Sequence, residues 1–524
     1  MSQGELQKQQ QLIAALLDPS LYPHPAKKIQ LIETHISWVL LAGRFAYKIK
    51  KALDLGFLNT LRLDARHTDC QEELRLNRRL APQLYLDVLA ISGSHTEPKF
   101  GAQPAIEYAV VMRRFAPNNT FDHLIPRNKI NSQHISLLAH TLANFHASIP
   151  SISGSSECFS QTVLSSLQQN FTQLATLTTD LHAFEGLRIK SLQLYDLIKL
   201  LIYSRHAKGF VRECHGDLHL GNIALIRNRP TPFDGIDFNP TLRWIDVMDE
   251  VAFLFMDLLH QQQPALAYHF LNAYLELSGD YAGIALLNFY GNYRALVRAK
   301  VAFIRASQFT ASPAKRKKSL SSAQQYLALA QQLLTSRHPA LIITHGLPGS
   351  GKSTFAQTAL EHLGAIRIRS DVERKRLFGL SALANSQAHN DIYSAEATQR
   401  TYAYLLDIAR GLLRAGETVI VDAAFLNRGE REMFKNLAET MQIPFAIVSL
   451  QSNKATLRAR IFKRQGLAND ASEASIDVLK KLAAVQEPIA PSEINFTLVY
   501  QNEHDYAIEQ PVWTALNRLL GRQE

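Results

Sequence analysis

Residues 346–354 read Gly346-Leu347-Pro348-Gly349-Ser350-Gly351-Lys352-Ser353-Thr354. The segment follows the apolar run Leu341 to Thr344 and fits the pattern G-x-x-x-x-G-K-[ST], which is rare by chance between a strand and a helix. Its glycines let the backbone curl so that N–H groups face phosphate oxygens, and a helix beginning at Ser353 adds its positive end. We expect Lys352 to reach the β- and γ-phosphates of ATP and Ser353 to ligate Mg²⁺. The residues expected to complete this nucleotide site are Gly346, Gly349, Ser350, Gly351 and Thr354.

The sequence beyond this loop alternates between short apolar runs and longer amphipathic segments. The predicted strands and helices cover Ala365 to Ile368, Ser394 to Arg414, Val419 to Asp422 and Phe445 to Leu450. This alternation is typical of an α/β P-loop NTPase domain with a parallel sheet. Asp422 ends an apolar strand, where we expect it either to hold Mg²⁺ through water or to contact the substrate.

The first half carries a second phosphate-handling pattern, His215-Gly216-Asp217-Leu218-His219-Leu220-Gly221-Asn222. Phosphoryl transfer requires positioning and charge stabilisation more than covalent chemistry. Asp217 is placed to accept or orient the proton of an attacking hydroxyl, and Asn222 to hold a metal. Asp237, in Gly235-Ile236-Asp237-Phe238, is the expected second metal ligand, with Asp234 as its rival.

The elements expected around this motif form an α+β arrangement. Residues 35–50 predict a β-hairpin that turns at Ala42-Gly43-Arg44. A helix is expected over 69–80, and further strands are expected over 106–112, 223–226 and 233–238. From Asp249 to about Arg305 the pattern is helical.

The order His-Gly-Asp-x-His-x-x-Asn followed by Ile-Asp-Phe resembles the aminoglycoside phosphotransferase branch of the kinase-like fold, which includes choline and fructosamine kinases. The resemblance covers about residues 30–305 and implies a bilobal protein-kinase-like domain. It implies that Lys48 pairs with the α- and β-phosphates and that Glu73 is its helix partner, with Glu72 as the alternative. It also implies that Met112 to Arg114 meets adenine through backbone groups. Asp246 and Glu250 resemble carboxylates that support the catalytic loop from below.

Two features depart from the kinase pattern. The hairpin has Gly43 but no G-x-G-x-x-G, and the D-F-G and A-P-E triplets of protein kinases are absent. The absence of these triplets favours a small hydroxylated acceptor over a protein acceptor.

Residues 340 to about 490 resemble the P-loop kinases of small molecules and polynucleotide ends and the zeta-toxin-like group. The resemblance implies that Asp371 activates the acceptor hydroxyl and that Arg374 grips the substrate; the alternative is a capped, solvated helix start. Arg460 and Arg464 lie on a segment that resembles a lid helix and would neutralise transition-state charge. Arg428 and Arg431 are expected to face the pocket. The alternative for these four arginines is a surface salt bridge.

The length and composition of the chain limit the number of domains and the class of protein. The 524 residues exceed one ordinary core, and 46% apolar residues argue against disorder. We predict a kinase-like domain over 1–335 and a P-loop ATPase or kinase domain over 336–524. The basic cluster Lys315 to Lys318 is expected to be a solvated linker. Three scattered cysteines and no long apolar run favour a cytoplasmic protein without a membrane partner.

Together the two patterns resemble a bacterial tandem family that joins an aminoglycoside phosphotransferase-like domain to an AAA-type or P-loop kinase-like domain. The sequence therefore predicts an ATP- and Mg²⁺-dependent bifunctional phosphotransferase that acts on hydroxyls of small polar metabolites. One alternative is a pseudokinase ligand sensor fused to an ATPase. A nucleic-acid end kinase, suggested by the net charge of +10, is the other; a nucleic-acid partner is not favoured.

Overall fold

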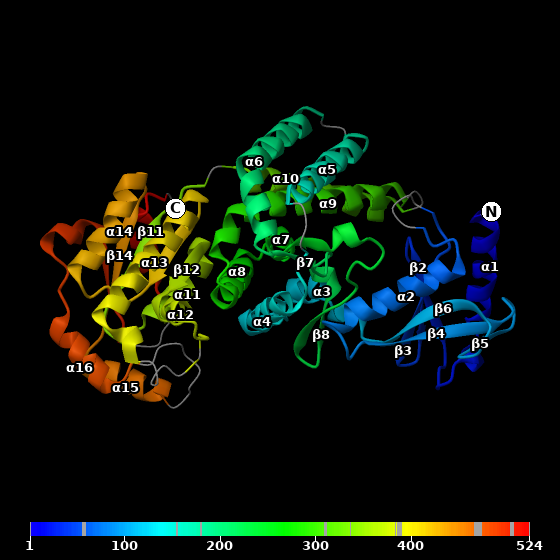
Figure 1. The fold of residues 1–524 in the computed structure, drawn as a ribbon, viewed down its shortest axis with the longest axis horizontal. Coiled ribbons are helices and arrows are strands. Elements are labelled where there is room, and N and C mark those ends of the chain that lie inside the picture. Colours follow the sequence, from blue (N-terminus) through cyan, green and yellow to red (C-terminus); the bar gives the residue numbers. More distant parts are fainter. Residues whose placement is uncertain are drawn as a thin grey trace. The chain divides into compact units, whose positions relative to one another are not determined.

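The structure is a computed structural model that describes residues 2–54, 59–152, 156–178, 181–308, 312–335, 337–382, 384, 390–465, 474–503 and 508–522. Its contacts divide the chain into two compact units (Figure 1). The first unit comprises Met1–Thr172 and Lys199–Asp257, and the second comprises Gln173–Ile198 and Leu258–Glu524. The second unit thus includes helices upstream of residue 335, and the domain boundary placed at 335/336 by the sequence stays a prediction.

The first unit begins with an antiparallel sheet of six strands in the order β1-β2-β3-β6-β4-β5. The strands are β1 Ile29–Glu33, β2 Ser37–Ala42, β3 Phe45–Lys50, β4 Tyr85–Gly93, β5 Pro98–Phe100 and β6 Ala105–Arg113. Helix α1 (Ser2–Ala15) contributes Leu12 and Ile13 to a core with Trp38 and Ile49. Helix α2 (Leu63–Arg78) packs Leu74 in a second cluster with β6. The predicted hairpin is confirmed, because β2 and β3 pair across a two-residue turn.

Two short antiparallel strand pairs flank the segment His215 to Asn222, which is called the catalytic-loop motif below. β7 (Val211–Glu213) pairs with β10 (Trp244–Asp246), and β8 (Ile223–Ile226) pairs with β9 (Arg229–Pro232). The strand predicted over 223–226 is confirmed. The strand predicted over 233–238 is wrong, because Asp234 has a left-handed backbone (φ 61°), which interrupts extended structure after β9.

Helices make up most of the remaining chain before the P-loop. They are α3 Phe121–Leu124, α4 Ser132–Ser148, α5 Ser156–Ala175, α6 Leu181–Ala207, α7 Val247–His260, α8 Pro264–Ser278, α9 Ile284–Gln308 and α10 Pro313–Leu333. Lys315 to Lys318 are part of α10 and not of an irregular linker. Within the described chain, no helix combines the length and the apolar character needed to cross a bilayer.

The second unit contains a sheet of five parallel strands in the order β12-β13-β11-β14-β15, which confirms the predicted α/β class. The strands are β11 Leu341–His345, β12 Ala365–Arg369, β13 Thr418–Asp422, β14 Phe445–Gln451 and β15 Thr497–Gln501. Sequence reasoning missed β15, which is short and only partly buried.

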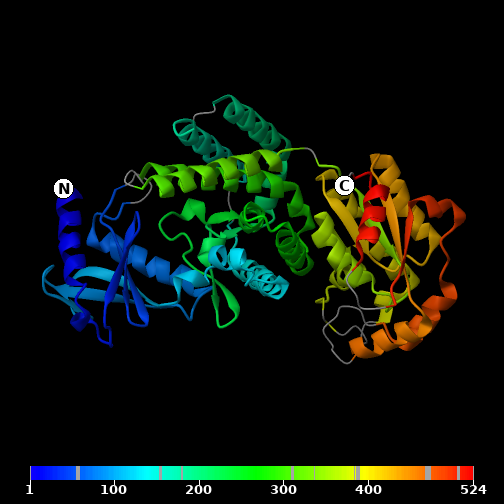
Figure 2. The same cartoon turned by 180° about the vertical axis from the view of Figure 1, so that it is seen from behind.

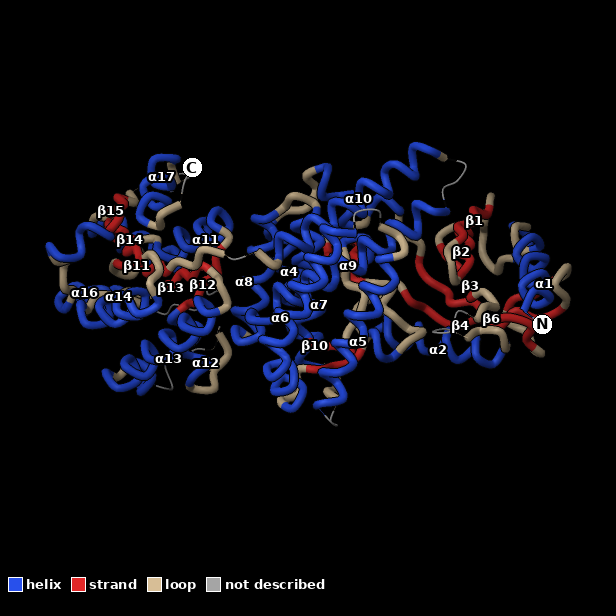
Figure 3. The backbone as a smooth tube through the Cα atoms, turned by 90° about the horizontal axis from the view of Figure 1, so that it is seen from above, coloured by secondary structure: helices blue, strands red, loops and turns tan. Residues whose placement is uncertain are grey.

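Helices cover both sides of this sheet (Figure 3). They are α11 Lys352–Leu363, α12 Ser370–Leu377, α13 Ala395–Arg414, α14 Arg428–Met441, α15 Lys454–Gln465, α16 Ile476–Val485 and α17 Gln510–Leu519. Figure 2 shows α17, in red, in front of the sheet. Its Trp513 and Leu516 share a core with Phe355 of α11 and with Ile342 and Ile420 of the sheet. Because all five strands run in the same direction, the loops after β11, β12 and β13 meet at one edge.

Candidate functional site

One buried carboxylate supports the catalytic-loop motif of the first unit. Gly216 has φ +84°, and a Cβ there would lie 2.7 Å from the carbonyl oxygen of Leu242, so glycine is required. The Gly216 N–H donates to Glu250 Oε1 (2.8 Å), and Glu250 Oε2 lies 2.8 Å from His146 Nε2. Burial alone would raise the pKa of Glu250, but His146 and the loop outweigh it and the pKa is lowered. Glu250 therefore lies where the resemblance places it, under the loop.

The loop brings Asp217 and Asn222 together. Asn222 Nδ2 donates to Asp217 Oδ2 and to the Asp217 carbonyl oxygen, both at 3.0 Å. Asp257 Oδ2 accepts the N–H of Leu220 (2.9 Å), which fixes the turn between them. The Asp217 side chain is 38% exposed. A carboxylate oriented by an amide and open to solvent is suited to accept the proton of an incoming hydroxyl.

Two lysines and three carboxylates form an ion cluster in the same unit. Lys48 and Lys50 are two residues apart on β3 and therefore point to the same face. Lys48 Nζ lies 2.8 Å from Glu73 Oε1 and 2.7 Å from Asp234 Oδ1. Lys50 Nζ lies 2.8 Å from Glu73 Oε2 and also pairs with Asp237. Glu73 thus lies between the two ammonium groups.

The contacts differ between Glu72 and Glu73 and between Asp234 and Asp237, the two pairs that the sequence left as alternatives. Glu72 points elsewhere, pairing with Arg75 (2.6 Å) and Arg243 (2.8 Å). The ammonium groups beside Glu73 outweigh its burial and lower its pKa to about 2. Asp237 is buried and Asp234 half exposed, with side-chain exposures of 6% and 48%.

The pKa of Asp237 differs from that of Glu73. Burial raises the pKa of Asp237 to about 6, although Lys50 lowers it. The N–H of Ile236, the residue before it, donates to the carbonyl oxygen of His215 (2.9 Å). The segment that carries Asp237 therefore lies beside the loop that carries Asp217. Carboxylate and amide oxygens are the ligands that Mg²⁺ prefers, so Asp237 and Asn222 fit a metal.

Met112, the expected hinge residue, lies within β6. The N–H groups of Arg113 and Arg114 donate to the carbonyl oxygens of Leu84 (2.8 Å) and Arg44 (2.9 Å). These two amides are therefore engaged in the chain's own structure, and adenine contact at Met112 stays a prediction.

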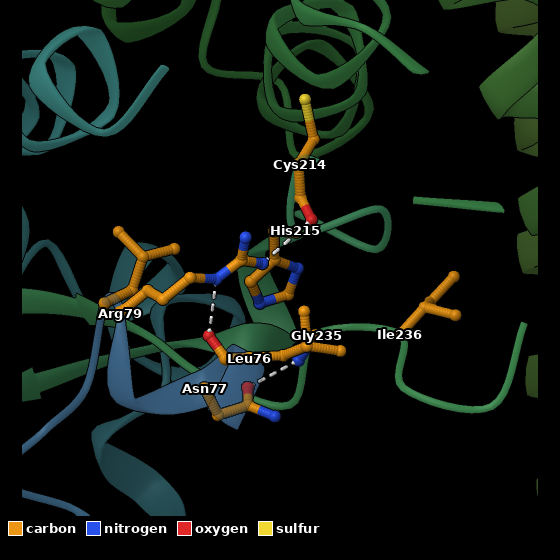
Figure 4. Close-up of a pocket in the computed structure, with 8 residues that line it drawn as sticks. Leu76, Asn77, Arg79, Cys214, His215, Gly235 and Ile236 are labelled. Carbon is orange, nitrogen blue, oxygen red and sulfur yellow. Dashed lines mark hydrogen bonds between the residues drawn. The ribbon is translucent and has the colours of Figure 1, made fainter. Parts of the chain in front are cut away.

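A small cavity lies between α2, the start of the catalytic loop and residues 235–236 (Figure 4). Its volume is about 10 Å³, which is room for about one water molecule. Asn77 Oδ1 accepts the N–H of Gly235 (2.8 Å), and Arg79 donates to the carbonyl oxygen of Leu76 (3.0 Å). The cavity is too small for a nucleotide, so we assign it to the support of the loop.

The second site is shaped by the backbone conformation of its glycines. Gly346, Gly349 and Gly351 have φ values of +147°, +84° and +93°. A Cβ on Gly346 would lie 2.5 Å from the Leu450 carbonyl oxygen, and one on Gly349 would lie 2.8 Å from that of Leu457. Only glycine combines these angles with these close approaches. The predicted loop therefore has the cradle geometry that its pattern implies.

The side chains around this cradle also fit a metal-bound triphosphate. Lys352 Nζ donates to the carbonyl oxygens of Gly346 (2.9 Å) and Leu347 (3.0 Å). Asp422 Oδ2 and Ser350 Oγ are buried and, within the described chain, have no hydrogen-bond partner. A buried carboxylate oxygen without a donor is suited to a hydrated divalent cation. Ser353 and Thr354 are in the first turn of α11.

The predicted acceptor residues follow β12 directly. Asp371 is near the start of α12 and half-buried. Arg374 is buried, and its Nη1 donates to the carbonyl oxygen of Ile392 (2.7 Å) and to Thr398 Oγ1 (3.2 Å). Arg374 therefore contacts the chain that leads into α13, and its grip on a substrate stays a prediction.

The arginines of the predicted lid are on α15. Arg460 Nη1 donates to the carbonyl oxygen of Asn502 (2.9 Å), while Asn502 Nδ2 donates to the Ser350 carbonyl oxygen (2.8 Å). Asn502 thus links Arg460 to the P-loop by hydrogen bonds. The side chain of Arg464 lies outside the described residues.

Arg428 and Arg431 do not face the pocket as expected. Arg428 is exposed and pairs with Glu432 (2.8 Å), which is the salt-bridge alternative. Arg431 is buried and binds Glu493 through Nε (2.8 Å) and Nη2 (2.9 Å). A buried bidentate pair is a structural contact.

Sequence reasoning missed the roles of Lys50 and Arg369. Lys50 shares Glu73 with Lys48, and the alternation Lys-Ile-Lys on β3 is the signal that predicts it. Arg369 Nε lies 3.8 Å from Asp422 Oδ2, and the two residues are register partners on β12 and β13. Its signal is weaker, since only the strand order brings Arg369 beside Asp422.

Two protein families match the chain. Residues 58–287 match the Phosphotransferase enzyme family, and residues 341–489 match the AAA domain. Similar curated proteins include the uncharacterized protein Rv2004c of Mycobacterium tuberculosis and the uncharacterized protein Mb2027c of Mycobacterium bovis. Each is 29% identical over 471 residues, covering 87% of this chain and 90% of the relative.

Solved structures similar to parts of the chain include two kinases. Amicoumacin kinase hAmiN, in complex with AMP-PNP, Ca²⁺ and Ami, is 13% identical with a TM-score of 0.40, covering 63% of this chain and 95% of its own. A gluconokinase from Sinorhizobium meliloti 1021 is 20% identical with a TM-score of 0.24, covering 35% of this chain and 91% of its own.

Proposed function

We propose that the chain transfers phosphoryl groups at two sites. It joins a phosphotransferase-family domain to a P-loop kinase-like domain and is thus a kinase-type phosphotransferase. In this proposal both sites use ATP and Mg²⁺, and the acceptors are hydroxyls of small polar metabolites. The three cysteines are unpaired, which fits a reducing cytoplasm. The observation that carries the proposal is the half-exposed Asp217 carboxylate oriented by Asn222.

At the first site, Asp217 accepts the proton of the acceptor hydroxyl. Lys48, oriented by Glu73, binds phosphate oxygens, while Asn222 and Asp237 hold the metal. Met112 contacts adenine. The bound cation supplies charge neutralisation for the transferring phosphoryl group.

At the second site, the amides from Gly346 to Thr354 and the Lys352 ammonium bind the triphosphate. Ser353 and Asp422 hold the metal, and Asp371 orients the second acceptor. The cations assigned to the substrate and to the transferring group are Arg374, Arg460 and Arg464.

Labelled ATP incubated with the protein and a metabolite extract tests this function. Asp217→Asn should lower transfer to the first acceptor by ~10²–10⁴ and leave the second acceptor labelled, since Asp217 acts only at the first site. Lys352→Ala should abolish labelling of the second acceptor alone. Unchanged labelling of every compound by both variants would reject the assignment.

One observation favours a second candidate, in which the first unit senses a ligand without transferring phosphate. The β2–β3 hairpin turns in two residues and has Gly43 as its single glycine, so it offers little backbone to clamp phosphates. Isothermal titration of the full chain carrying Lys352→Ala distinguishes the two functions. Binding of a metabolite from the extract without Mg²⁺–ATP binding would favour the sensor.

A further inference from the structure

Helix α8 falls within the stretch that matches the phosphotransferase family, yet it is part of the second compact unit. It packs against β12, the edge strand of the parallel sheet. Asn272 Nδ2 donates to the Ala365 carbonyl oxygen (2.9 Å), and Asn272 Oδ1 accepts the N–H of Arg367 (2.6 Å). One side chain thus satisfies the backbone of this sheet edge in the way that another strand would.

One turn further along α8, Glu276 binds two arginines of the same strand. Glu276 Oε1 accepts from Arg369 Nη1 at 2.8 Å, and Oε2 accepts from Arg367 Nη2 at 3.0 Å. The side chains of Glu276, Arg367 and Arg369 are 23%, 10% and 15% exposed, so solvent screens these pairs weakly. Burial alone would raise the pKa of Glu276, but the two guanidinium groups outweigh it and lower the pKa.

Both arginines also reach toward the P-loop site. Arg367 Nη1 donates to the carbonyl oxygen of Ser353 at 3.4 Å. Arg369 Nε lies 3.8 Å from Asp422 Oδ2, which is beyond hydrogen-bond distance. That oxygen is buried, and within the described residues no donor reaches it. A guanidinium this close to a buried carboxylate would ordinarily form a paired, hydrogen-bonded contact at about 2.7–2.9 Å.

We infer that Glu276 is a positioning residue of the P-loop site, which holds Arg369 back from Asp422 and so keeps that carboxylate available to the nucleotide's divalent cation. This inference rests on the proposed function, in which Lys352 and Asp422 bind Mg²⁺–ATP. The guanidinium of Arg369 and the cation compete for one carboxylate. Glu276 decides the competition because its Oε1 accepts a charge-assisted hydrogen bond from the Arg369 guanidinium, while its Oε2 is held by Arg367. The second site therefore depends on a side chain that lies upstream of the AAA match.

The experiment measures how a fluorescent ATP analogue binds the full-length protein as the Mg²⁺ concentration is raised. Binding at the second site is the part that Lys352→Ala removes from each variant. Glu276→Gln should raise the Mg²⁺ concentration for half-maximal binding by about tenfold or more, because Arg369 then neutralises Asp422. Arg369→Gln alone should lower this midpoint. The double variant should return to within about threefold of wild type.

A matched control changes the packing of the same helix without touching the arginines. His269 lies two turns earlier on α8, and its Nδ1 is 2.7 Å from Glu361 Oε1, so His269→Gln changes a different polar contact of this helix. It should leave the Mg²⁺ midpoint within about threefold of wild type. An unchanged midpoint in Glu276→Gln would overturn the inference, as would a double variant that binds no better than Glu276→Gln. A midpoint raised by Arg369→Gln would overturn it even if Glu276→Gln did not fold. The proposed function fails in a different way, when wild type shows no Lys352-dependent binding at any Mg²⁺ concentration, and that result removes the inference with it.

Discussion

The two proposed phosphate sites of this chain are built in different ways. In the first unit, side-chain charges define the site: two ammonium groups, Lys48 and Lys50, face the carboxylates of Glu73, Asp234 and Asp237. In the second unit, the backbone of Gly346 to Gly351 defines it, and the Lys352 ammonium binds backbone carbonyls. A charged cluster keeps its geometry through the pairing of opposite charges, whereas a glycine cradle keeps its geometry through torsion angles. The first site should therefore be sensitive to the loss of a charge, and the second to the addition of a methyl group.

The largest effect that this contrast predicts is on the folding of the first unit. Glu73→Gln leaves two buried ammonium groups without the carboxylate between them, and breaking a buried pair in this way costs ~3–5 kcal/mol. Urea unfolding of the full chain, followed in the transition of the first unit, measures the change. Glu72→Gln is the matched control, because Glu72 pairs at a more exposed place and should cost ~1 kcal/mol or less. Equal losses in both variants would show that the cluster does not hold the site together.

A somewhat smaller effect concerns pH and the second unit. Burial lowers the pKa of His345, the last residue of β11, to about 4. In the folded protein His345 therefore stays neutral down to about pH 4, whereas in the unfolded chain it takes up a proton below pH 6.5. Its contribution to stability is complete above pH 6.5 and is lost as the pH falls from 6.5 to 4, by about 3 kcal/mol in all.

Unfolding of the second unit measured at pH 7, 6, 5 and 4 tests the His345 contribution. His345→Asn should flatten the dependence in this window, because it removes the group that protonates. His338→Asn, at an exposed position seven residues earlier, should leave the wild-type slope. A wild-type slope in His345→Asn would assign the acid sensitivity to other groups.

The glycine cradle could be predicted from the sequence because its constraints are local. Gly346 and Gly351 are spaced by the turn that they make, and a strand before and a helix after confirm their context. Asp217 and Asn222 were predictable for the same reason, since only four residues separate them and they contact each other directly.

The charged cluster could be predicted only in part, because its members meet across the fold. Lys48 and Asp234 are 186 residues apart, and no local pattern reports that they pair at 2.7 Å. Arg369 and Glu276 were missed for the same reason, since an edge strand and a helix from an earlier segment bring them together. The strand predicted over 233–238 failed because apolar spacing does not register the left-handed turn at Asp234.

The smallest predicted effect tests the backbone side of the comparison. Gly351 has φ +93°, and a Cβ there would overlap the side-chain amide of Asn502, which donates to the Ser350 carbonyl oxygen. An L-residue in this conformation costs ~1–2 kcal/mol, so in Gly351→Ala the loop should relax and bind the ATP analogue ~5–30-fold more weakly. Gly411→Ala is the matched control: Gly411 is in helix α13, and a Cβ there has no heavy atom within 4 Å. It should stabilise the second unit by ~0.5–1 kcal/mol and leave binding unchanged. Wild-type binding by Gly351→Ala would mean that side chains, and not main-chain geometry, hold the triphosphate at the second site, and the contrast between the two halves of the chain would disappear.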